Sequence, residues 1–511
     1  MAERILFVTS NGTGLGHLTR SMAIARRLDG SFEPLVLTLS AAAPVVRELG
    51  FPVEYVASYG TPGAGSDWRW SRRLRARLRA AIAEAAPRLI VFDGAHPYQA
   101  LIDALGGARG TRAVWCRRPM WRPGSNPGAL ARTRFFDAVL EPGELAERED
   151  RGPTVARRDE AHRVGPIVFC EVEELEPRAD AERALGLEPG KVNVLVQLGQ
   201  GPEVASAVKR CLDHLAGRGD VQVAALSSTI ARLLAVPEGI VHLRSTYPMS
   251  RYFAAFDLAV SAAGYNAYHE LIRFGVPSLY VPMPRRTDDQ AARARYAEQA
   301  GIGLGTDGPD SERLEALLDE LLDPERRASM RERLGELRFE DGAAEAARWL
   351  GELARAEGGA GRGGSGRWRR WLRQPLDSAR RAAPFAARLP LHFAAFVKQT
   401  IVRRPPRTVV LALGVAEGAL ERQLEGALAL TPDPPRRVLV ITDSLEFDPL
   451  LRAGVGFEHV PGPGEAQAQL AGGDYHAFLS RRVALVLAER PRPRRALTIG
   501  ETGSDLLAEI A

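Results

Sequence analysis

The sequence predicts an α/β protein with two Rossmann-like domains that face each other across a cleft, followed by a small third α/β module. Three observations predict this fold class. Strand-like apolar runs alternate with helical patterns through residues 1–350, a break near "HRVGPIV" divides them into two blocks, and each block opens with a strand and a glycine-containing turn. Such alternation is typical of parallel sheets covered by helices on both faces. A chain of 511 residues is also too long for a single core.

The first block, residues 1–163, and the second block, residues 164–356, are each about the size of one domain. Short apolar runs predict strands at 5–8, 34–39, 89–92 and 113–115 in the first block and at 192–198, 221–226, 258–261 and 278–281 in the second. Helical patterns lie between these runs, the clearest at 18–28, 203–216 and 265–274. Each block is therefore expected to form one parallel sheet with its helices.

The remainder of the chain divides near residue 407. Residues 357–406 begin as a glycine-rich linker and become a basic segment with two tryptophans. Residues 407–511 contain the strand-like runs "RTVVLALGV", "RRVLVITDS" and "RRALTIG", and a helix through "HAFLSRRVALVLAER". No spacing in this last module indicates chemistry, so we expect an interaction or packing role.

The composition excludes several classes of protein. The hydrophobic runs are shorter than a membrane span, and the first residues lack the layout of a signal peptide. Cys116, Cys170 and Cys211 are scattered, without disulfide or metal-site spacing. The net charge of +5 comes with only three lysines, which indicates an arginine-rich compositional bias rather than a nucleic-acid partner. We expect a soluble cytoplasmic protein.

The first glycine turn, Gly12-x-Gly14-x-Gly16-His17, follows the strand at 5–8. A dinucleotide fingerprint needs Gly-x-Gly-x-x-Gly and an acid at the end of the second strand. Here the third glycine comes one residue early, and the second strand ends in Ser40 and alanines, so a nicotinamide or flavin cofactor is disfavoured. The turn serves either backbone geometry alone or close approach of a substrate, and His17 favours the second interpretation.

A second motif lies in residues 256–301. A strand ends at Ser261, a turn of small residues follows, and a helix begins near Tyr265. A helix N-terminus binds phosphate well, because its amides and its dipole both favour negative charge. Glu270 lies just over one turn into this helix, where a carboxylate can accept hydrogen bonds from ribose hydroxyls, and Asp289 and Gln290 suit sugar hydroxyls. The motif therefore predicts a nucleotide-sugar site, although Glu270 alone would indicate a solvated helix face.

This segment resembles the C-terminal nucleotide-sugar domain of glycosyltransferase family 28, and "GTGLGH" resembles the glycine-rich loop of the same family. The resemblance covers roughly residues 1–350, with the motifs of both halves in the correct order. It implies a GT-B fold in which the second domain binds the donor and the first domain binds the acceptor. It also implies transfer of a hexose, such as an N-acetylhexosamine, from a nucleotide sugar (UDP-linked in our prediction) to a hydroxyl of a cell-envelope glycan, a lipid-linked acceptor or a small molecule.

The resemblance also assigns roles to individual residues. Gly264, Tyr265 and Asn266, next to Ser261, face the donor diphosphate or sugar, and Glu270 holds the ribose. Asp289 and Gln290 hold the transferred hexose. A second loop, formed by Gly199, Gln200 and Gly201, packs against the phosphates. The first glycine turn lines the floor of the cleft with Gly14, Gly16 and His17. The sequence departs from the family after the interdomain turn, where "GPIVFCEVEEL" has acids instead of a phosphate-binding arginine, and Arg285 and Arg286 are the expected substitutes.

The predicted mechanism needs no metal ion and no cofactor other than the nucleotide sugar as co-substrate. No Asp-x-Asp motif occurs in the chain, so helix dipoles and arginines must stabilise the leaving diphosphate. His17 is the predicted general base, with a structural or substrate-orienting histidine as the alternative. Asp93 and His96 are second candidates for a base or an orienting partner, although such loop residues commonly cap the next helix. A one-step displacement inverts the anomeric configuration.

Two basic and aromatic stretches suggest peripheral attachment to the inner face of the plasma membrane. Residues 68–79, from Trp68 to Arg79, belong to a helix pattern with leucines at four-residue intervals and arginines on the other faces. Residues 368–404, from Trp368 to Arg404, combine aromatic residues with many arginines and one acid. The first stretch fits either an ordinary surface helix or a helix that docks on anionic lipid, and the second fits either a membrane contact or a solvated linker.

Two alternatives to a transferase remain open from the sequence. A nucleotide-sugar hydrolase or epimerase of GT-B fold could carry the same glycine loop, and would turn over the donor without any acceptor. A non-catalytic scaffold that binds nucleotide sugars would bind the donor without turnover. Glu270 does not discriminate among the three, because each would use it to hold the ribose.

Overall fold

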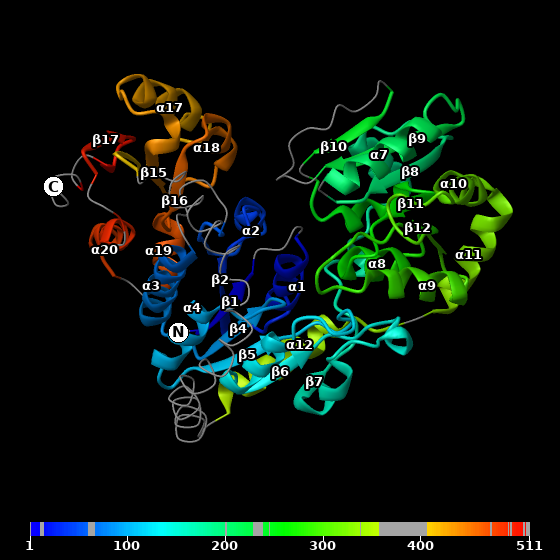
Figure 1. Cartoon of the computed structure of the whole chain (residues 1–511), viewed down its shortest axis with the longest axis horizontal. Helices are drawn as coiled ribbons and strands as arrows, with labels where there is room; N and C mark the ends of the chain where they lie inside the picture. Colours follow the sequence, from blue (N-terminus) through cyan, green and yellow to red (C-terminus); the bar gives the residue numbers. More distant parts are fainter. Residues whose placement is uncertain are drawn as a thin grey trace, which may run out of the picture.

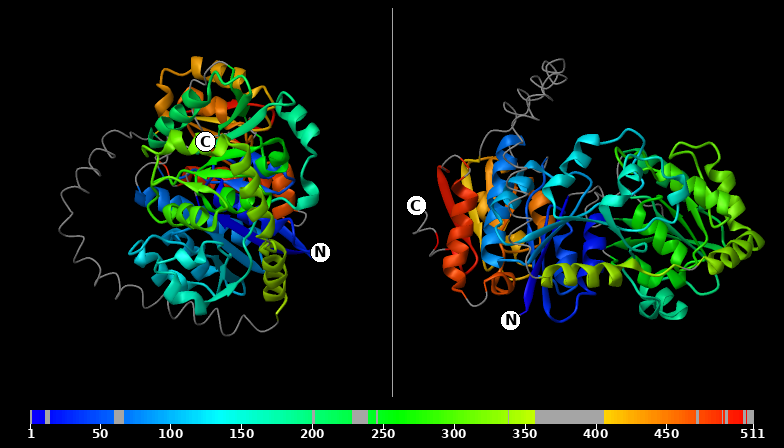
Figure 2. Two further views of the ribbon diagram at one scale, coloured as in Figure 1. Left: turned by 90° about the vertical axis from the view of Figure 1, so that its right-hand side faces the viewer. Right: turned by 90° about the horizontal axis from the view of Figure 1, so that it is seen from below.

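The fold was analysed in a computed structural model of the chain. The structure describes residues 2–10, 15–59, 67–199, 202–227, 239–244, 246–337, 339–356, 406–470, 473–488, 490, 493–503 and 506. Three parallel sheets organise these residues, and the first domain lies between the second domain and the third module (Figure 1). Two further views show the same order along the molecule (Figure 2). The predicted α/β fold class is confirmed.

The first domain contains a seven-stranded parallel sheet in the order β3-β2-β1-β4-β5-β6-β7. Its strands are β1 (Glu3–Thr9), β2 (Phe32–Thr38), β3 (Val53–Tyr55), β4 (Leu89–Asp93), β5 (Arg112–Cys116), β6 (Ala138–Glu141) and β7 (Ala161–Arg163). The helices next to the sheet are α1 (Gly16–Ala25), α2 (Ala43–Glu48), α3 (Asp67–Ala85) and α4 (Gln99–Gly107). Thr9 pairs with Asp93, so β1 and β4 end at the same edge of the sheet.

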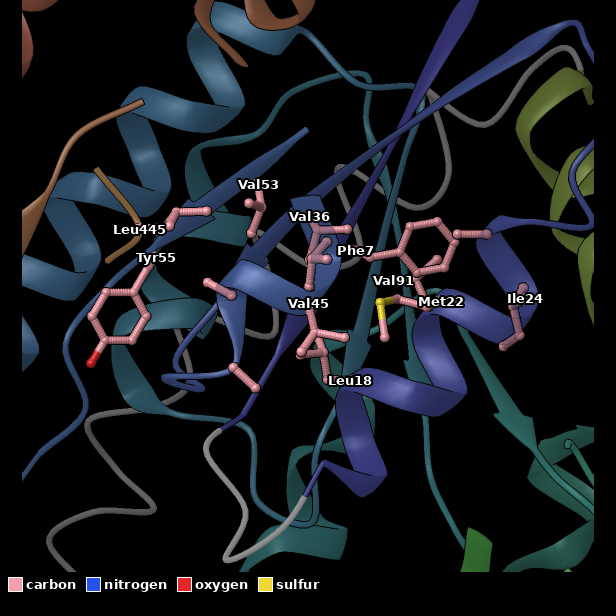
Figure 3. Packing of buried hydrophobic residues seen from close by; sticks show 14 of the residues in the cluster. Phe7, Leu18, Met22, Ile24, Val36, Val45, Val53, Tyr55, Val91 and Leu445 are labelled. Carbon is pink, nitrogen blue, oxygen red and sulfur yellow. The ribbon is translucent and has the colours of Figure 1, made fainter. Parts of the chain in front are cut away.

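One face of this sheet packs against α1 and α2, and the other packs against α3 and α4. In Figure 3, Phe7, Val36 and Val91 of three neighbouring strands lie beside Met22 of α1. On the other face, Leu74 of α3 belongs to a separate buried cluster. The strands are apolar on both faces because both faces are covered, as parallel sheets require.

The second domain contains a six-stranded parallel sheet in the order β10-β9-β8-β11-β12-β13. Its strands are β8 (Val192–Gln197), β9 (Val221–Ser227), β10 (Val241–Arg244), β11 (Leu258–Ser261), β12 (Ser278–Tyr280) and β13 (Leu304–Gly305). Its helices are α6 (Arg178–Leu185), α7 (Pro202–Leu215), α8 (Tyr265–Arg273), α9 (Gln290–Ala300), α10 (Leu314–Leu322) and α11 (Pro324–Glu336). The strand order reverses between β8 and β11, and α8 begins beside this reversal, where open α/β sheets bind ligands.

The helix α12 (Gly342–Arg355) follows the second domain in the sequence but packs on the first (Figure 1). Ala346 and Leu350 belong to the same buried cluster as α1. Trp349 stacks on His162 of β7 with ring centroids 4.4 Å apart. The end of the second block in the sequence therefore completes the core of the first domain.

The third module contains a four-stranded parallel sheet in the order β16-β15-β14-β17. Its elements are β14 (Thr408–Ala412), α17 (Leu420–Ala429), β15 (Val438–Thr442), α18 (Phe447–Ala453), β16 (Gly456–His459), α19 (Pro463–Gln469), α20 (Tyr475–Ala488) and β17 (Arg495–Ile499). The three predicted strands and the predicted helix are all present. The ring centroids of Tyr55 in the first domain and Phe447 in the third module are 4.7 Å apart. Figure 3 shows Leu445 of the third module next to Tyr55.

The basic helix α3 is divided between solvent and protein. Trp68 is 51% exposed, and the guanidinium groups of Arg69 and Arg72 lie over its ring. Arg73 and Arg77, one and two turns further, are buried in ion pairs with acids of the third module and of β3. The inward-facing arginines of the predicted membrane-facing stretch are therefore taken up by buried ion pairs, whereas its first turn is exposed.

The second predicted membrane-facing stretch, residues 368–404, lies outside the described residues. None of the helices in the described part of the chain has the length and apolar character needed to cross a bilayer. The three cysteines are buried and form no disulfide.

Candidate functional site

A cavity of about 590 Å³ lies between the first and second domains. On one side it is lined by α1 and α2, and on the other by the start of α8 and the loop before α9. Because α1 and α8 follow the carboxyl ends of β1 and β11, the cavity lies at the edge where both sheets present their ligand-binding turns. The predicted site residues that line it are Gly16, His17, Gly199, Gly264, Tyr265, Asn266, Glu270 and Gln290.

The first-domain side of the cavity carries a histidine–aspartate pair. His17 stands in the first turn of α1, and its Nδ1 atom lies 2.7 Å from Oδ1 of Asp93, the last residue of β4. Because an ionised carboxylate only accepts hydrogen bonds, the Nδ1 atom carries the proton and the Nε2 lone pair remains available. Burial lowers the pKa of His17 more than Asp93 raises it, so the imidazole is neutral at neutral pH.

Arg20 fixes the charge and the position of Asp93. Its Nε donates to Oδ2 of Asp93 at 2.9 Å and its terminal nitrogen donates to Oδ1, which makes a two-pronged contact. Both side chains are at most 2% exposed. Burial raises the pKa of Asp93, but Arg20 and His17 together lower it by more. The net pKa is below its ordinary value, so the carboxylate stays ionised. Arg20 is one helical turn from His17, and the sequence analysis missed it.

The second-domain side of the cavity is the start of α8. Gly264 is the residue before the helix, it has extended backbone angles, and no side chain caps the first turn. Ser261, at the end of β11, is fully buried and is not among the residues that line the cavity. Gly199, with φ +85°, follows the end of β8 and lies near the Arg285 side chain. These glycines leave room for a ligand to approach the backbone.

Tyr265 and Asn266 connect the two domains. The Tyr265 hydroxyl donates to the carbonyl oxygen of Gly143 at 2.8 Å and accepts a hydrogen bond from the amide of Ile167. Asn266 donates from Nδ2 to the carbonyl oxygen of Gly16 at 3.2 Å. Both residues line the cavity, but their polar groups hold the glycine turn and the interdomain segment in place.

Glu270 is buried at the inner end of the cavity. One carboxylate oxygen accepts a hydrogen bond from the amide of Phe169 at 3.2 Å, in the segment that joins the domains. The side chain is 9% exposed. Burial raises the pKa of Glu270 to about 7, and the Phe169 amide only partly offsets this effect. The carboxylate therefore changes charge close to physiological pH.

The loop before α9 places its side chains differently from the prediction. Asp289 accepts a hydrogen bond from the amide of Ala292 and caps α9, and it does not line the cavity. Gln290 lines the cavity while its oxygen accepts from the amide of Met283 and its nitrogen donates to Asp288. Asp288, which the sequence analysis did not select, is the acid of this loop that lines the cavity.

Segments from both domains pair along this loop. Trp121 forms an isolated antiparallel bridge with Asp288, and the Asp289 amide donates to the carbonyl oxygen of Met120. Deeper in the interface, Glu144 of the first domain accepts from Nε of Arg293 at 2.8 Å. Arg293 and Glu144 are both at most 1% exposed. The two domains are thus held together around the cavity by paired backbone and buried charges.

Some predicted residues are not part of this arrangement. Gly14, Gln200 and Gly201 lie outside the described residues. His96 is exposed, contacts Asn126, and is absent from the lining of the cavity. Within the described residues, no group of three or more His, Cys, Asp or Glu side chains is arranged to hold a metal ion.

Comparison with known proteins gives this arrangement a family context. Residues 221–346 match the family model described as the glycosyltransferase family 28 C-terminal domain. A relative from Aquifex aeolicus is 32% identical over 28% of this chain and 43% of its own length. A relative from Caldicellulosiruptor saccharolyticus is 24% identical over 69% of this chain and 97% of its own length.

Both relatives carry the name UDP-N-acetylglucosamine–N-acetylmuramyl-(pentapeptide) pyrophosphoryl-undecaprenol N-acetylglucosamine transferase. The chain spans less than half the length of two of these relatives, from Aquifex aeolicus and Salinibacter ruber. Among solved structures, a spinosyn forosaminyltransferase is 16% identical, with a TM-score of 0.49 over 70% of this chain and all of that one.

Proposed function

We propose that this chain, in which residues 221–346 match the glycosyltransferase family 28 C-terminal domain, transfers a hexose from a UDP-sugar to a hydroxyl of a lipid-linked cell-envelope acceptor, with inversion and without a metal ion. The observation that carries this proposal is the cavity in which the His17–Asp93 pair faces the start of α8 and Glu270. The names of the relatives support a UDP-sugar donor and a lipid-linked acceptor.

In the proposed reaction, His17 is the general base. The acceptor hydroxyl gives its proton to Nε2 of His17 while its oxygen attacks the anomeric carbon of the sugar. The bond from that carbon to the diphosphate breaks on the opposite face, so the configuration inverts. Asp93, which accepts from Nδ1, stabilises the imidazolium that forms, and Arg20 keeps Asp93 ionised.

The donor occupies the second-domain side of the cavity. The uncapped start of α8 offers backbone amides and the positive end of the helix dipole to the leaving diphosphate. Glu270 exchanges the Phe169 amide for the ribose hydroxyls, and Gln290 is directed toward the sugar. In such a cavity, aligned dipoles stabilise charge that develops in the transition state without a cation site.

The lipid-linked acceptor would reach the cavity from a membrane surface. The exposed Trp68, with Arg69 and Arg72 beside it, would contact an anionic bilayer from the first turn of α3. An aromatic ring flanked by arginines suits the lipid–water interface. Sedimentation with vesicles that contain anionic lipid tests this contact, and Trp68→Ala with intact vesicle binding would contradict it.

Nucleotide release tests the reaction. We expect UDP to be released from UDP-N-acetylglucosamine only when a polyprenyl-diphosphate-linked sugar acceptor is added, and His17→Ala to remove this release. Fast release without an acceptor would instead indicate a hydrolase. Tight donor binding without release under any acceptor would indicate a scaffold. A panel of UDP-, dTDP-, GDP- and ADP-sugars in the same assay identifies the nucleotide.

A further inference from the structure

The segment that joins the domains, around residues 164–177, supplies none of the arginines that line the cavity. Its acids Glu171 and Glu174 form ion pairs with Arg27 and Arg26 at the end of α1. Arg27 also pairs with Asp341, just before α12, at 2.6 Å. These contacts tie the segment to the first domain. The positive charge that a nucleoside diphosphate requires must therefore come from elsewhere in the cavity.

Four arginines line the cavity, and they differ in how fully they are neutralised: Arg20, Arg118, Arg285 and Arg286. Arg20 is committed to both oxygens of Asp93. Arg285 and Arg286 belong to the loop before α9, which we call the donor loop. No acidic partner for either arginine is found among the described residues. Arg118 comes from the first domain, just after β5, and reaches across to the donor loop of the second.

Among the described residues, the acid that pairs with Arg118 is Asp288, which Arg118 shares with Arg293. Its terminal nitrogen lies 3.2 Å from Oδ1 of Asp288, and its Nε is buried without a hydrogen-bond partner. Its side chain is 15% exposed. Burial, together with the nearby Arg293 and Arg20, lowers the pKa of Arg118 despite the attraction of Asp288. Positive charge at this position is thus only partly compensated.

Asp288 does not depend on Arg118. The same carboxylate accepts from Arg293 at 2.8 Å and from Gln290 at 3.2 Å. Although burial raises its pKa, Arg118 and Arg293 hold the pKa of Asp288 at about 2. Asp288 would keep two hydrogen-bond donors if Arg118 turned to another anion, and it would then share Arg293 with Glu144.

We propose that Arg118 is a donor-binding residue, which exchanges Asp288 for the diphosphate of the nucleotide sugar. This inference rests on the proposed function. Arg118 then binds the diphosphate from the first domain while Arg285, next to Gly199, binds it from the second. An arginine fork suits phosphate oxygens better than a point charge does. The leaving group thereby draws both domains together over the sugar.

Calorimetric titration of the full chain with UDP and with uridine tests the inference, because the two probes differ only in the diphosphate. We expect Arg118→Ala to weaken UDP binding by about 10- to 100-fold, the size of a lost charge-assisted hydrogen bond, and to leave uridine binding unchanged. Arg118→Lys should be intermediate. Asp288→Asn should tighten UDP binding by about threefold or more, because it removes the competing anion. That gain should disappear in the double variant with Arg118→Ala.

Arg122→Ala is the matched control. Arg122 lies on the same loop and donates to the carbonyl oxygen of Arg285, but it is exposed and does not line the cavity. It should leave both affinities unchanged. If Arg118→Ala weakens UDP and uridine equally, or changes neither, Arg118 is a structural partner of Asp288 and the inference is wrong while the proposed function stands. If the wild type binds none of UDP, dTDP, GDP and ADP, the proposed function fails and the inference fails with it.

Discussion

The first domain has two interfaces of opposite character. Its contact with the second domain encloses a cavity of about 590 Å³ lined by polar and charged side chains. Its contact with the third module has a shared hydrophobic core in which Tyr55 packs on Phe447 and Phe457. Both interfaces contain arginine–carboxylate pairs, so the presence of such pairs does not by itself indicate a functional site.

The difference lies in what surrounds the pairs. At the third module, Glu54 of β3 accepts from Arg77 of α3 and from Arg482 of α20, and all three side chains are at most 2% exposed. Each of these side chains has an oppositely charged partner, although Nη1 of Arg77 and Nε of Arg482 have no hydrogen-bond partner among the described residues. At the cleft, His17 and Arg118 line the cavity itself. A buried network with no such cavity beside it fixes one arrangement, whereas charged groups that line a cavity can exchange partners with a ligand.

The largest expected effect is on the turnover number, and it comes from residues of the cleft. His17→Ala removes the proposed base and should lower kcat by about 10²- to 10⁴-fold, with little change in donor affinity. Asp93→Asn should lower kcat in the same direction, because the amide no longer stabilises the imidazolium. Steady-state kinetics of nucleotide release check both variants. A full kcat in His17→Ala would assign the histidine to positioning or to structure.

The largest expected effect on stability lies at the other interface. Glu54→Ala leaves Arg77 and Arg482 without their shared buried partner and should lower the free energy of unfolding by about 3–5 kcal/mol. Glu33→Ala is the control, since Glu33 is 36% exposed and pairs with Arg4 on the same sheet. That change should cost about 0–1 kcal/mol. Equal costs for the two variants in urea unfolding would mean that the third module is not part of the first-domain core.

A pH effect should separate the interfaces further. In the proposed function Glu270 must be ionised to accept hydrogen bonds from two ribose hydroxyls, and burial raises its pKa to about 7. Uridine affinity, which involves no phosphate titration, should therefore fall as the pH drops below 7, by up to about tenfold per pH unit. Isothermal titration at several pH values measures this slope. The slope should be absent in Glu270→Gln, and an unchanged slope would exclude Glu270 as its origin.

Glu270 also affects the stability of the fold, but here the protonated form is favourable, whereas ligand binding needs the ionised form. A raised carboxyl pKa means that the folded protein holds its proton more tightly than the unfolded chain does. The contribution of Glu270 to stability is therefore favourable below its ordinary pKa and is lost as the pH rises through about 7. Glu270→Gln should raise the melting temperature at pH 8 and leave it nearly unchanged at pH 4.5. A lower melting temperature at pH 8 would contradict this assignment.

The smallest effect is expected at the rim of the third-module interface. Arg47 is 42% exposed and pairs with Glu465 of α19. Arg47→Ala should lower the free energy of unfolding by about 0–1 kcal/mol, because solvent screens an exposed pair. Thermal unfolding checks this value. A loss comparable to that of Glu54→Ala would show that the interface depends on its rim rather than on its core.

The sequence predicted those features that depend on local order. The start of α8 and the eight strands selected from apolar runs reflect periodicity and backbone geometry, which act over a few residues. His17 and Asp93 were selected separately as candidates, and the structure brings them together because the turns after neighbouring parallel strands meet at one sheet edge.

Other features depend on contacts between distant segments and could not be predicted from patterns. Arg118 and Asp288 meet across two domains, 170 positions apart in the numbering. The helix α12 returns to the first domain after the second is complete, and the arginines of α3 turn inward because the third module supplies Glu458. Asp289 was selected as a sugar ligand, but its side chain caps α9, which leaves Asp288 in the cavity.

The central claim is that the cleft between the first and second domains binds a nucleotide sugar. Calorimetric titration of UDP-N-acetylglucosamine into the wild type and into Glu270→Ala tests it most directly. The account predicts saturable binding of one donor per chain, weakened at least about tenfold in Glu270→Ala and unchanged in Arg47→Ala. Equal affinities of the wild type and Glu270→Ala, or no binding of any nucleotide sugar by the wild type, would contradict it.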